Sequence, residues 1–196
     1  MKKSSIILIS IVAALAVIFL WGTSGYNNLV TLRENVNSQW GNVQSQYQRR
    51  SDLIPNLVST VKGYATHESS TLEGVVAARA KATQVMIDPK NLTPEKLQEY
   101  QAAQGQVSAA LGKLLMITEN YPNLKADQNF LELQAQLEGT ENRISVERNR
   151  YNDSAKEYDK SIKYFPKSII AAFCGFTEKP YFEAEKGTEK APSVKF

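Results

Sequence analysis

Apolar residues recur along most of this chain with the spacing of a single helical face. Between residues 27 and 67 the large apolar side chains stand three or four positions apart, with one gap of seven residues over Arg50. They are Val36, Trp40, Val43, Tyr47, Ile54, Leu57, Val61 and Tyr64. In a helix this spacing places them on one narrow stripe. We therefore predict a long helix from about Asn27 to about His67.

The region after this stripe has two interpretations. The helix either runs straight through Glu68 towards Met86 as one continuous segment, or it ends and restarts at Ser70. Ser70 and Glu73 have the spacing of a capping box ahead of an apolar run, which favours a restart. The spacing alone does not separate the two.

Two further stripes follow. Thr93 and Pro94 have the order of an N-cap and first helical turn, and they predict a helix to about Asn120, ended by Pro122. Its stripe is Leu97, Tyr100, Gln104, Val107, Leu111, Leu114, Thr118 and Tyr121. A last helix starts near Lys125 to Asp127 and ends before Pro166, with Phe130, Leu137, Ile144, Tyr151, Tyr158 and Phe165 recurring every seven residues.

Three long seams of this kind predict the fold class. A period near 3.5 residues is typical of helices that pack at small crossing angles, as in coiled coils and antiparallel bundles. No segment shows the alternation of a half-buried strand. We predict an all-α fold in which an N-terminal transmembrane helix precedes an antiparallel bundle of long, coiled-coil-like helices.

The first 25 residues read as a membrane anchor. Lys2 and Lys3 precede an uncharged run, and residues 4–25 are about long enough to cross the hydrocarbon core of a bilayer. A cleaved signal peptide would begin in the same way, but Phe19 to Trp21 stand where a cleavage site needs small side chains. Retention is favoured. If the anchor helix runs on into the bundle the two form one rod, and Gly22 and Gly25 make a bend there plausible.

The flanking charges predict an orientation. The short basic N-terminus is expected in the cytoplasm, with the bundle on the far side of the cell membrane, by the positive-inside rule. Without the two N-terminal lysines the remainder carries 21 basic and 20 acidic side chains. That balance argues against nucleic acid as a partner.

Candidate chemistry is sparse. His67 and Glu68 resemble the opening of a zinc motif, but Thr71 stands at the second ligand position and the chain holds no other histidine. Cys174 is the single cysteine, and within its apolar surroundings we expect an inert buried thiol. Carboxylate pairs on long helices are usually solvated charges. We expect no cofactor, no metal and no enzymatic activity.

Arg50 and Pro55 interrupt the first stripe. Pro55 lacks the amide proton that an interior helical position donates, so we expect a kink near Ser51 to Pro55. Arg50 either lays its stem along the bundle with its head in solvent or on a carboxylate, or forms a partly buried ion pair that fixes helix register. A glutamate of the last helix, such as Glu138 or Glu147, is the candidate partner.

Several multi-residue motifs carry a family resemblance. They are YNNLVTLRENV (26–36), YQRRSDLIPNLVSTVKGYATHE (47–68), ENYPNLKADQNFLELQAQLEGTENRI (119–144), RNRYND (148–153), FP (165–166) and GF (175–176). In this order they resemble the LemA family, which implies a bacterial membrane-anchored helical protein without an assigned reaction. The predicted divisions are an anchor at 1–25, a LemA-like bundle at 26–176 and a mobile tail at 177–196.

The motifs also supply candidate interaction residues. Asn56, His67 and the segment Glu119 to Phe130, which includes Tyr121, lie within them, and Tyr64 lies on the adjoining seam. Polar residues here form either a contact surface between subunits, or caps and loop anchors.

Two functions fit these observations, and a third is disfavoured. The first is a membrane scaffold: lipid holds residues 4–25 and the bundle associates with copies of itself, because long rods with narrow seams often need partner helices. The second is an adaptor or regulator of another membrane protein, such as a protease or signalling receptor, docked on the kinked first helix. An enzyme would require carboxylate chemistry that no motif here indicates.

Overall fold

The computed structural model describes residues 3–65 and 67–183. Throughout these residues the regular structure is helical, with no strand, and the predicted all-α fold is confirmed. In chain order the elements are α1 (Lys3–Tyr64), α2 (Ser69–Gln84), the short 3-10 helix η1 (Pro89–Asn91), α3 (Pro94–Thr118), α4 (Pro122–Lys125), α5 (Gln128–Lys163) and α6 (Lys167–Cys174).

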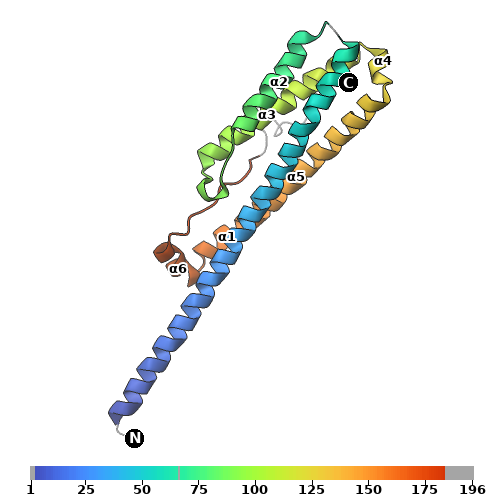
Figure 1. The fold of residues 1–196 in the computed structure, drawn as a ribbon. Coiled ribbons are helices and arrows are strands. Elements are labelled where there is room, and N and C mark those ends of the chain that lie inside the picture. The colour runs from blue at the N-terminus through green and yellow to red at the C-terminus, as the bar shows by residue number, and fades with distance from the viewer. Residues whose placement is uncertain (1–2, 66, 184–196) are drawn as a thin grey trace, which may run out of the picture.

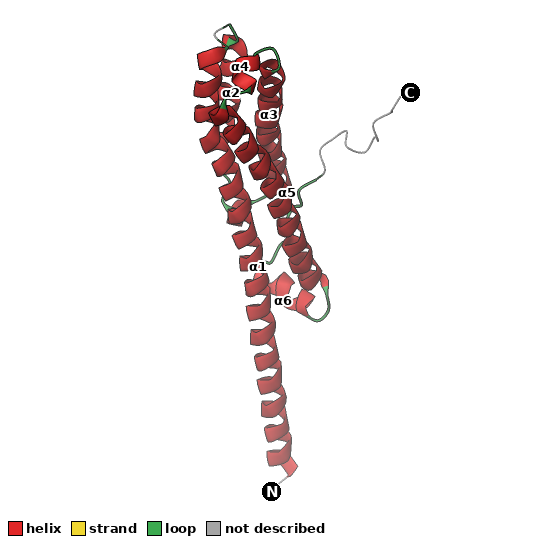
Figure 2. Ribbon diagram, turned by 90° about the vertical axis from the view of Figure 1, so that its right-hand side faces the viewer, coloured by secondary structure: helices red, strands yellow, loops and turns green. Residues whose placement is uncertain are grey.

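Four of these helices run alternately up and down in an elongated bundle (Figure 1). α1 and α5 form the long pair, α2 and α3 pack as a hairpin beside them, and the first part of α1 projects from one end (Figure 2). We call that end proximal, and the opposite end, where α1, α2 and α4 meet, distal. α6 lies at the proximal end, against both α1 and α5.

α1 is one unbroken helix of 62 residues that joins the predicted anchor to the bundle. Its large apolar side chains from Ile6 to Trp21 are between 41% and 69% exposed, and this part is long and apolar enough to cross a membrane. The helix passes through Gly22 and Gly25 without interruption. Gly25 instead allows close approach of α6, because a Cβ there would lie 2.5 Å from Ile170 Cδ1.

The turn between α1 and α2 corrects the continuous-helix interpretation. α1 ends at Tyr64 and α2 begins at Ser69, with Glu68 rather than Ser70 as its N-cap residue and no side-chain capping bond. The chain reverses here because Leu72 and Val75 of α2 bury their side chains in the cluster that α1 also lines. An uninterrupted helix would have carried them away from the bundle.

The predicted starts of α3 and α5 are confirmed. Thr93 Oγ1 accepts a hydrogen bond from Lys96 N at 3.3 Å, and Asp127 Oδ1 accepts one from Phe130 N at 2.9 Å. Each satisfies an amide that has no partner within its own helix. Pro122 follows the end of α3 and also opens α4, at the distal end.

The core consists of two clusters. The aromatic cluster lies on the proximal side and includes Trp40, Tyr47, Tyr100, Tyr151, Tyr158 and Phe182. The aliphatic cluster lies on the distal side and includes Ile54, Leu57, Val61, Leu72, Val75, Val107, Leu111, Leu114, Leu124, Phe130 and Leu137. Two predicted seam residues are exposed, Tyr64 by 43% and Phe165 by 82%, and Tyr121 is partly buried. The two exposed residues stand where a helix ends and its stripe no longer faces the bundle.

The chain after α5 differs from the prediction in two ways. Cys174 is exposed rather than buried, as the last residue of α6. Residues 177–183, which we call the C-terminal segment, pack against α5 and bury Lys179 and Phe182. The packed region therefore extends beyond the predicted boundary at 176. Residues 184–196 of the predicted mobile tail lie outside the described residues.

Candidate functional site

Arg50 joins three helices at the junction of the two clusters. Its side chain is only 2% exposed. Nη1 donates to Ser108 Oγ and Glu141 Oε2, each at 2.8 Å. Nη2 donates to the backbone oxygen of Gln104 at 3.1 Å and to its Oε1 at 2.7 Å. The guanidinium carbon also lies 5.1 Å from the centre of the Tyr47 ring.

These contacts favour the ion-pair interpretation of Arg50, and its role in fixing helix register stays a prediction. The head is buried and forms a partly buried ion pair with a glutamate of the last helix, which is Glu141 rather than Glu138 or Glu147. Glu138 accepts a bond from Gln134, and Glu147 pairs with Arg150. A buried cation is tolerated only when its donors are satisfied, as they are here. Glu141 remains 53% exposed, so the pair is open to water on one side.

The backbone hydrogen bond that Pro55 cannot form is replaced by a bond from another helix. In a regular helix the amide of residue 55 would donate to the oxygen of Ser51, and proline has no such amide. Arg79 Nε of α2 donates to Ser51 O at 2.8 Å and supplies the missing bond. Pro55 and Asn56 are themselves exposed. α1 continues through Pro55, and the kink remains a prediction.

A cleft lies beside Arg50, between α1 and the hairpin. Its volume is about 600 Å³, and its lining includes Gln48, Arg49, Arg79, Thr83 and Met86. The Met86 side chain is 86% exposed. The cleft thus combines an exposed flexible apolar side chain with guanidinium groups, a composition suited to a protein contact.

The distal end brings together three of the predicted residues. Tyr64 donates from its hydroxyl to Asp127 Oδ2 at 2.9 Å, and Asp127 caps the helix that buries Phe130. Tyr121 donates to Glu68 Oε1 at 3.2 Å. The bond from Phe130 N, followed by that from Tyr64, lowers the pKa of Asp127.

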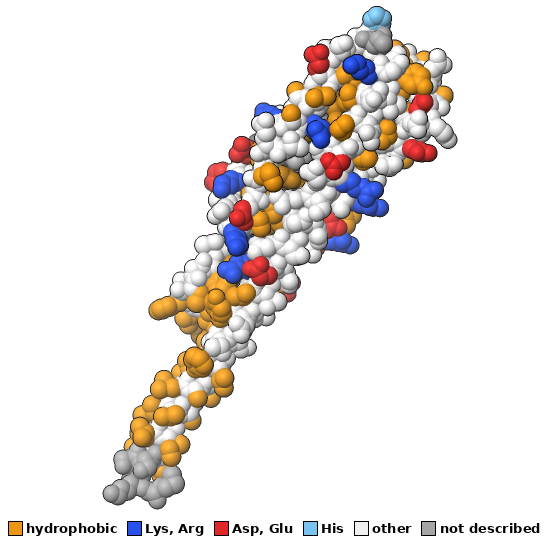
Figure 3. All heavy atoms as spheres, viewed as in Figure 1, with side chains coloured by type: hydrophobic (Ala, Val, Ile, Leu, Met, Phe, Trp, Pro, Cys, Tyr) orange, Lys and Arg blue, Asp and Glu red, His pale blue; other side chains and the backbone are white. Residues whose placement is uncertain are grey.

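The distal bonds tie the α1–α2 turn to the α3–α5 connection. They favour the cap and loop-anchor interpretation of these residues, and the bond to Asp127 raises the pKa of Tyr64. His67 is exposed beside them, at the tip of the molecule (Figure 3). Arg50, Pro55 and Asn56 lie apart from this group, at earlier positions of α1 on the proximal side of it.

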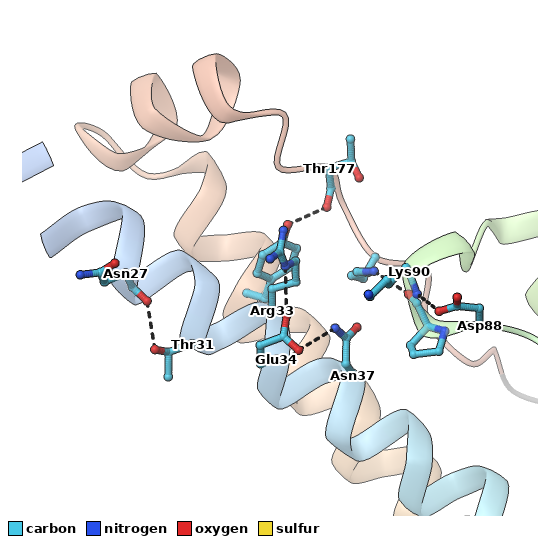
Figure 4. A network of polar contacts seen from close by, with 11 residues as sticks. Asn27, Thr31, Arg33, Glu34, Asn37, Asp88, Lys90 and Thr177 are labelled. Atoms are coloured by element: carbon cyan, nitrogen blue, oxygen red, sulfur yellow. Dashed lines mark hydrogen bonds and ion pairs between the residues drawn. The ribbon is translucent and has the colours of Figure 1, made fainter. Parts of the chain in front are cut away.

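A polar cavity of about 270 Å³ occupies the proximal side (Figure 4). Arg33, Glu34 and Asn37 of α1 face Lys90 of η1 and the C-terminal segment across it. Lys179 Nζ, on this side, donates to Pro89 O at 2.9 Å. Burial, and then the charge of Arg33, lower the pKa of Lys179. The cavity is a polar joint between α1, η1 and the C-terminal segment.

Sequence reasoning missed the side chains that hold the C-terminal segment. Asp159 accepts from Lys179 N at 3.0 Å and from the Tyr181 hydroxyl at 2.8 Å. Asn152 accepts from Phe182 N at 2.8 Å and donates to Phe182 O at 2.9 Å. These are side-chain bonds to an extended segment, which leave no periodic signal. The one available signal was Asn152 and Asp159 standing one and eight residues after Tyr151, on the edge of the last seam.

Within residues 3–65 and 67–183 no group of three or more His, Cys, Asp or Glu side chains is close enough to hold a metal ion. The polar groups at Arg50, at the distal end and at the C-terminal segment bond mainly to one another and to backbone. The arrangement is suited to fixing helices in register and to presenting surfaces.

The chain resembles known proteins over most of its length. A model of the LemA family matches residues 39–196. Magnetosome protein MamQ 1 of Paramagnetospirillum magneticum is 26% identical over 203 residues, which cover 95% of this chain and 73% of that protein. Magnetosome protein MamQ of Magnetospirillum gryphiswaldense is 26% identical, covering 86% of this chain and 68% of that protein. Protein LemA of Metamycoplasma hominis is 22% identical, covering 82% and 69%.

Proposed function

The chain belongs to the LemA family, and from that premise we propose that it is a non-enzymatic, membrane-anchored helical scaffold whose copies associate through the outer faces of the bundle. The observation that carries the proposal is the continuity of α1. One helix provides an exposed apolar segment of membrane-spanning length, and the same helix packs against α2, α4, α5 and α6 in the bundle. The bundle is thereby held at a fixed distance from the bilayer.

Self-association is supported by apolar side chains on outward faces. Val76 of α2 is 50% exposed, Met116 of α3 is 71% exposed, and Val146 of α5 is 47% exposed. Tethering in the membrane plane raises the effective concentration of such surfaces. Weak contacts are then sufficient to assemble copies.

The mass of the full chain in detergent tests this proposal. Light scattering with the detergent contribution subtracted should give a defined multimer. Val76→Lys and Val146→Lys each place a charge on an outer face without changing the core, and at least one should reduce the mass. A monomer for the unaltered chain would refute self-association. A multimer that neither exchange changes would refute assembly through the α2 and α5 faces.

The proposed location is the bacterial cell membrane, crossed once, with the N-terminus in the cytoplasm. The basic residues at positions 2 and 3 support this orientation. Asn129 is exposed at the distal end, so Asn129→Cys in a Cys174→Ser background provides a reporter. A membrane-impermeant maleimide should label it without opening of the cell membrane. Labelling only after that membrane is opened would reverse the orientation.

A second function, as an adaptor for another membrane protein, is favoured by the cleft beside Arg50 and the exposed Met86. A photo-cross-linking residue at position 86 of the full chain should then capture one defined protein in cells. The matched control is position 129, which is also exposed but lies outside the cleft lining. Equal capture from both positions would argue against a docking cleft.

A further inference from the structure

α6 presents an apolar surface that the bundle does not cover. Phe165, just before it, is 82% exposed, Ile169 is 54% exposed and Phe173 is 92% exposed. Ile169 and Phe173 are four residues apart and so share one side of the helix, and Phe165 stands in the turn that precedes it. Ala171 faces the opposite way and is buried. Large side chains grouped in this way usually mark a contact surface.

This surface continues into the apolar part of α1. A hollow of about 510 Å³ between the two helices is lined by Phe19, Tyr26, Ile169 and Phe173, together with Gly22, Thr23, Asn27, Ile170 and Cys174. Figure 3 shows hydrophobic side chains gathered where α6 meets α1, next to the projecting apolar segment. Ile170 packs against Gly25 and so fixes the position of α6 along α1.

α6 contacts α1 at the level where the membrane-spanning part of α1 ends. At a rise of about 1.5 Å per residue, about 20 residues cross a hydrocarbon core of about 30 Å. Counted from Ser4, that length ends near Thr23, which lines the hollow with α6. Trp21 and Tyr26 stand on either side of this level, and such side chains favour the boundary between lipid and water.

Charged groups begin on the bundle side of this level. Lys167 Nζ donates to Asn28 Oδ1 at 2.8 Å, and Lys163 pairs with Glu178 at 2.8 Å. Arg33 lies over the ring of Phe176, with 5.3 Å between its guanidinium carbon and the ring centre. The proximal end therefore changes from apolar to charged across α6, as a surface at a bilayer interface does.

We propose that Phe165, Ile169 and Phe173 insert into the interfacial layer of the bilayer, so that α6 is a second membrane contact beside the anchor. The occupant of this surface is lipid, because the surface is continuous with the part of α1 that faces lipid. The inference rests on the membrane anchoring contained in the proposed function. Two contacts at different points fix both the depth and the tilt of the bundle, whereas one helix alone fixes neither.

The single cysteine allows a direct test on the full chain. Cys174 is exposed at the end of α6, so a nitroxide attached to it reports the environment of this surface. The labelled chain is reconstituted at low protein-to-lipid ratio in vesicles of phosphatidylethanolamine and phosphatidylglycerol. Collision with oxygen, which partitions into lipid, is compared with collision with a water-soluble nickel chelate.

Two control labels, both in a Cys174→Ser background, give the limits of the scale. Leu15→Cys reports the interior of the anchor, and Asn129→Cys reports the distal end in water. The oxygen-to-nickel ratio at Cys174 should exceed that at the distal label several-fold. Phe165→Ser combined with Phe173→Ser should bring the Cys174 ratio down towards the distal value while the ratio at the Leu15→Cys label is unchanged.

Three results would overturn the proposal, and they differ from one another. A Cys174 ratio equal to the distal one, with the Leu15→Cys label in lipid, would show that the anchor holds but α6 does not insert. A ratio that rises with protein-to-lipid ratio would show that a second copy covers the surface. A Leu15→Cys label in water would refute the anchoring itself, and with it the membrane part of the proposed function.

Discussion

The aromatic and aliphatic clusters are lined by the same long helices, yet they are held together differently. In the aromatic cluster, ring packing is combined with hydrogen bonds to loops: Trp40 Nε1 donates to Ile87 O at 3.1 Å, and the Tyr151 hydroxyl donates to Pro180 O at 2.9 Å. The aliphatic cluster is lined mainly by branched side chains and is closed by caps at the distal end. The proximal half therefore depends on hydrogen bonds to loops and to the C-terminal segment, and the distal half on packed branched side chains closed by helix caps.

Arg50 stands between them and belongs to neither. Its bonds reach α3 and α5 from α1, so a slip of any one helix would separate the guanidinium from its partners. We infer that it sets the common register of both clusters. The expected effect of each substitution on stability then depends on the cluster in which the residue lies.

The largest effect is expected for Trp40→Ala in the aromatic cluster. Trp40 is fully buried and contacts Tyr100, Tyr151 and Phe182, with ring centres 5.3 to 5.8 Å apart. Removing such a side chain should lower the free energy of unfolding by about 4 kcal/mol. Urea unfolding of the full chain in detergent micelles, followed by circular dichroism, measures it.

The matched exchange in the aliphatic cluster is Leu57→Ala, expected to cost about 3 kcal/mol. Only Trp40→Ala should also expose the C-terminal segment to protease, because Phe182 stacks on Trp40. Equal cleavage in the two variants would remove the distinction between the halves.

Arg50→Ala should cost about 3 kcal/mol, because it leaves the buried Gln104 Oε1 without the donor that Arg50 supplies. Glu141→Gln is the control and should cost less than about 1 kcal/mol, since that side chain is half exposed. Arg50→Met retains the stem volume and should destabilise little, but the near-ultraviolet circular dichroism of the tyrosines should weaken as register is lost. A uniquely packed Arg50→Met variant would contradict the register role.

Phe182→Ala should cost about 2 kcal/mol, less than a central core aromatic, because the C-terminal segment can detach without disturbing the helices. The stacking on Trp40 and the contact of Arg148 with the Phe182 ring are lost together. Phe182→Leu should recover most of the loss in the same unfolding experiment. A full loss in both variants would indicate that ring geometry, rather than buried area, holds the segment.

The smallest effects concern two carboxyl groups with opposite pH dependence. Burial raises the pKa of Asp159 above its ordinary value of 3.8, although bonds from Lys179 N and Tyr181 oppose the rise. Because the folded protein then holds the proton more tightly, Asp159 contributes stability at low pH and loses it as pH rises from 3.8 through the raised pKa. Asp127 has a lowered pKa, so its contribution is present above 3.8 and is lost as pH falls through the folded value.

Unfolding midpoints of the full chain between about pH 3 and about pH 7 measure both contributions. Asp127→Asn should flatten the loss of stability on acidification, and Asp159→Asn should steepen it. The same change of slope in both variants would show that the two carboxyl groups do not differ in environment.

The sequence predicted features that depend on neighbouring residues better than contacts between distant segments, and the reason is physical. Thr93, Asp127 and the seams of α3 and α5 act within a few residues of the chain, so their spacing is visible in the sequence. The turn at Ala65 to Glu68 depends on how α2 packs back on α1, and both interpretations of the sequence fitted the spacing.

The candidate site shows the same division. The burial of Arg50 could be expected from its seam position, but its partner Glu141 could not, because Glu138, Glu141 and Glu147 all lie on the last helix near enough in register. Asp159 and Asn152 were missed since they bond to the backbone of the C-terminal segment, which has no repeat. Gly25 was interpreted as a bend, whereas it accommodates Ile170, a contact from another part of the chain.

The central claim is that α1 is one rigid helix, which fixes the position of both clusters relative to the membrane. Amide hydrogen exchange of the full chain in lipid nanodiscs tests it most directly, because a hinge would expose amides that the helix protects. We predict that residues 22–28 exchange as slowly as residues 36–47 of the same helix. Rapid exchange confined to residues 22–28 would show that anchor and bundle move independently, and would contradict the account.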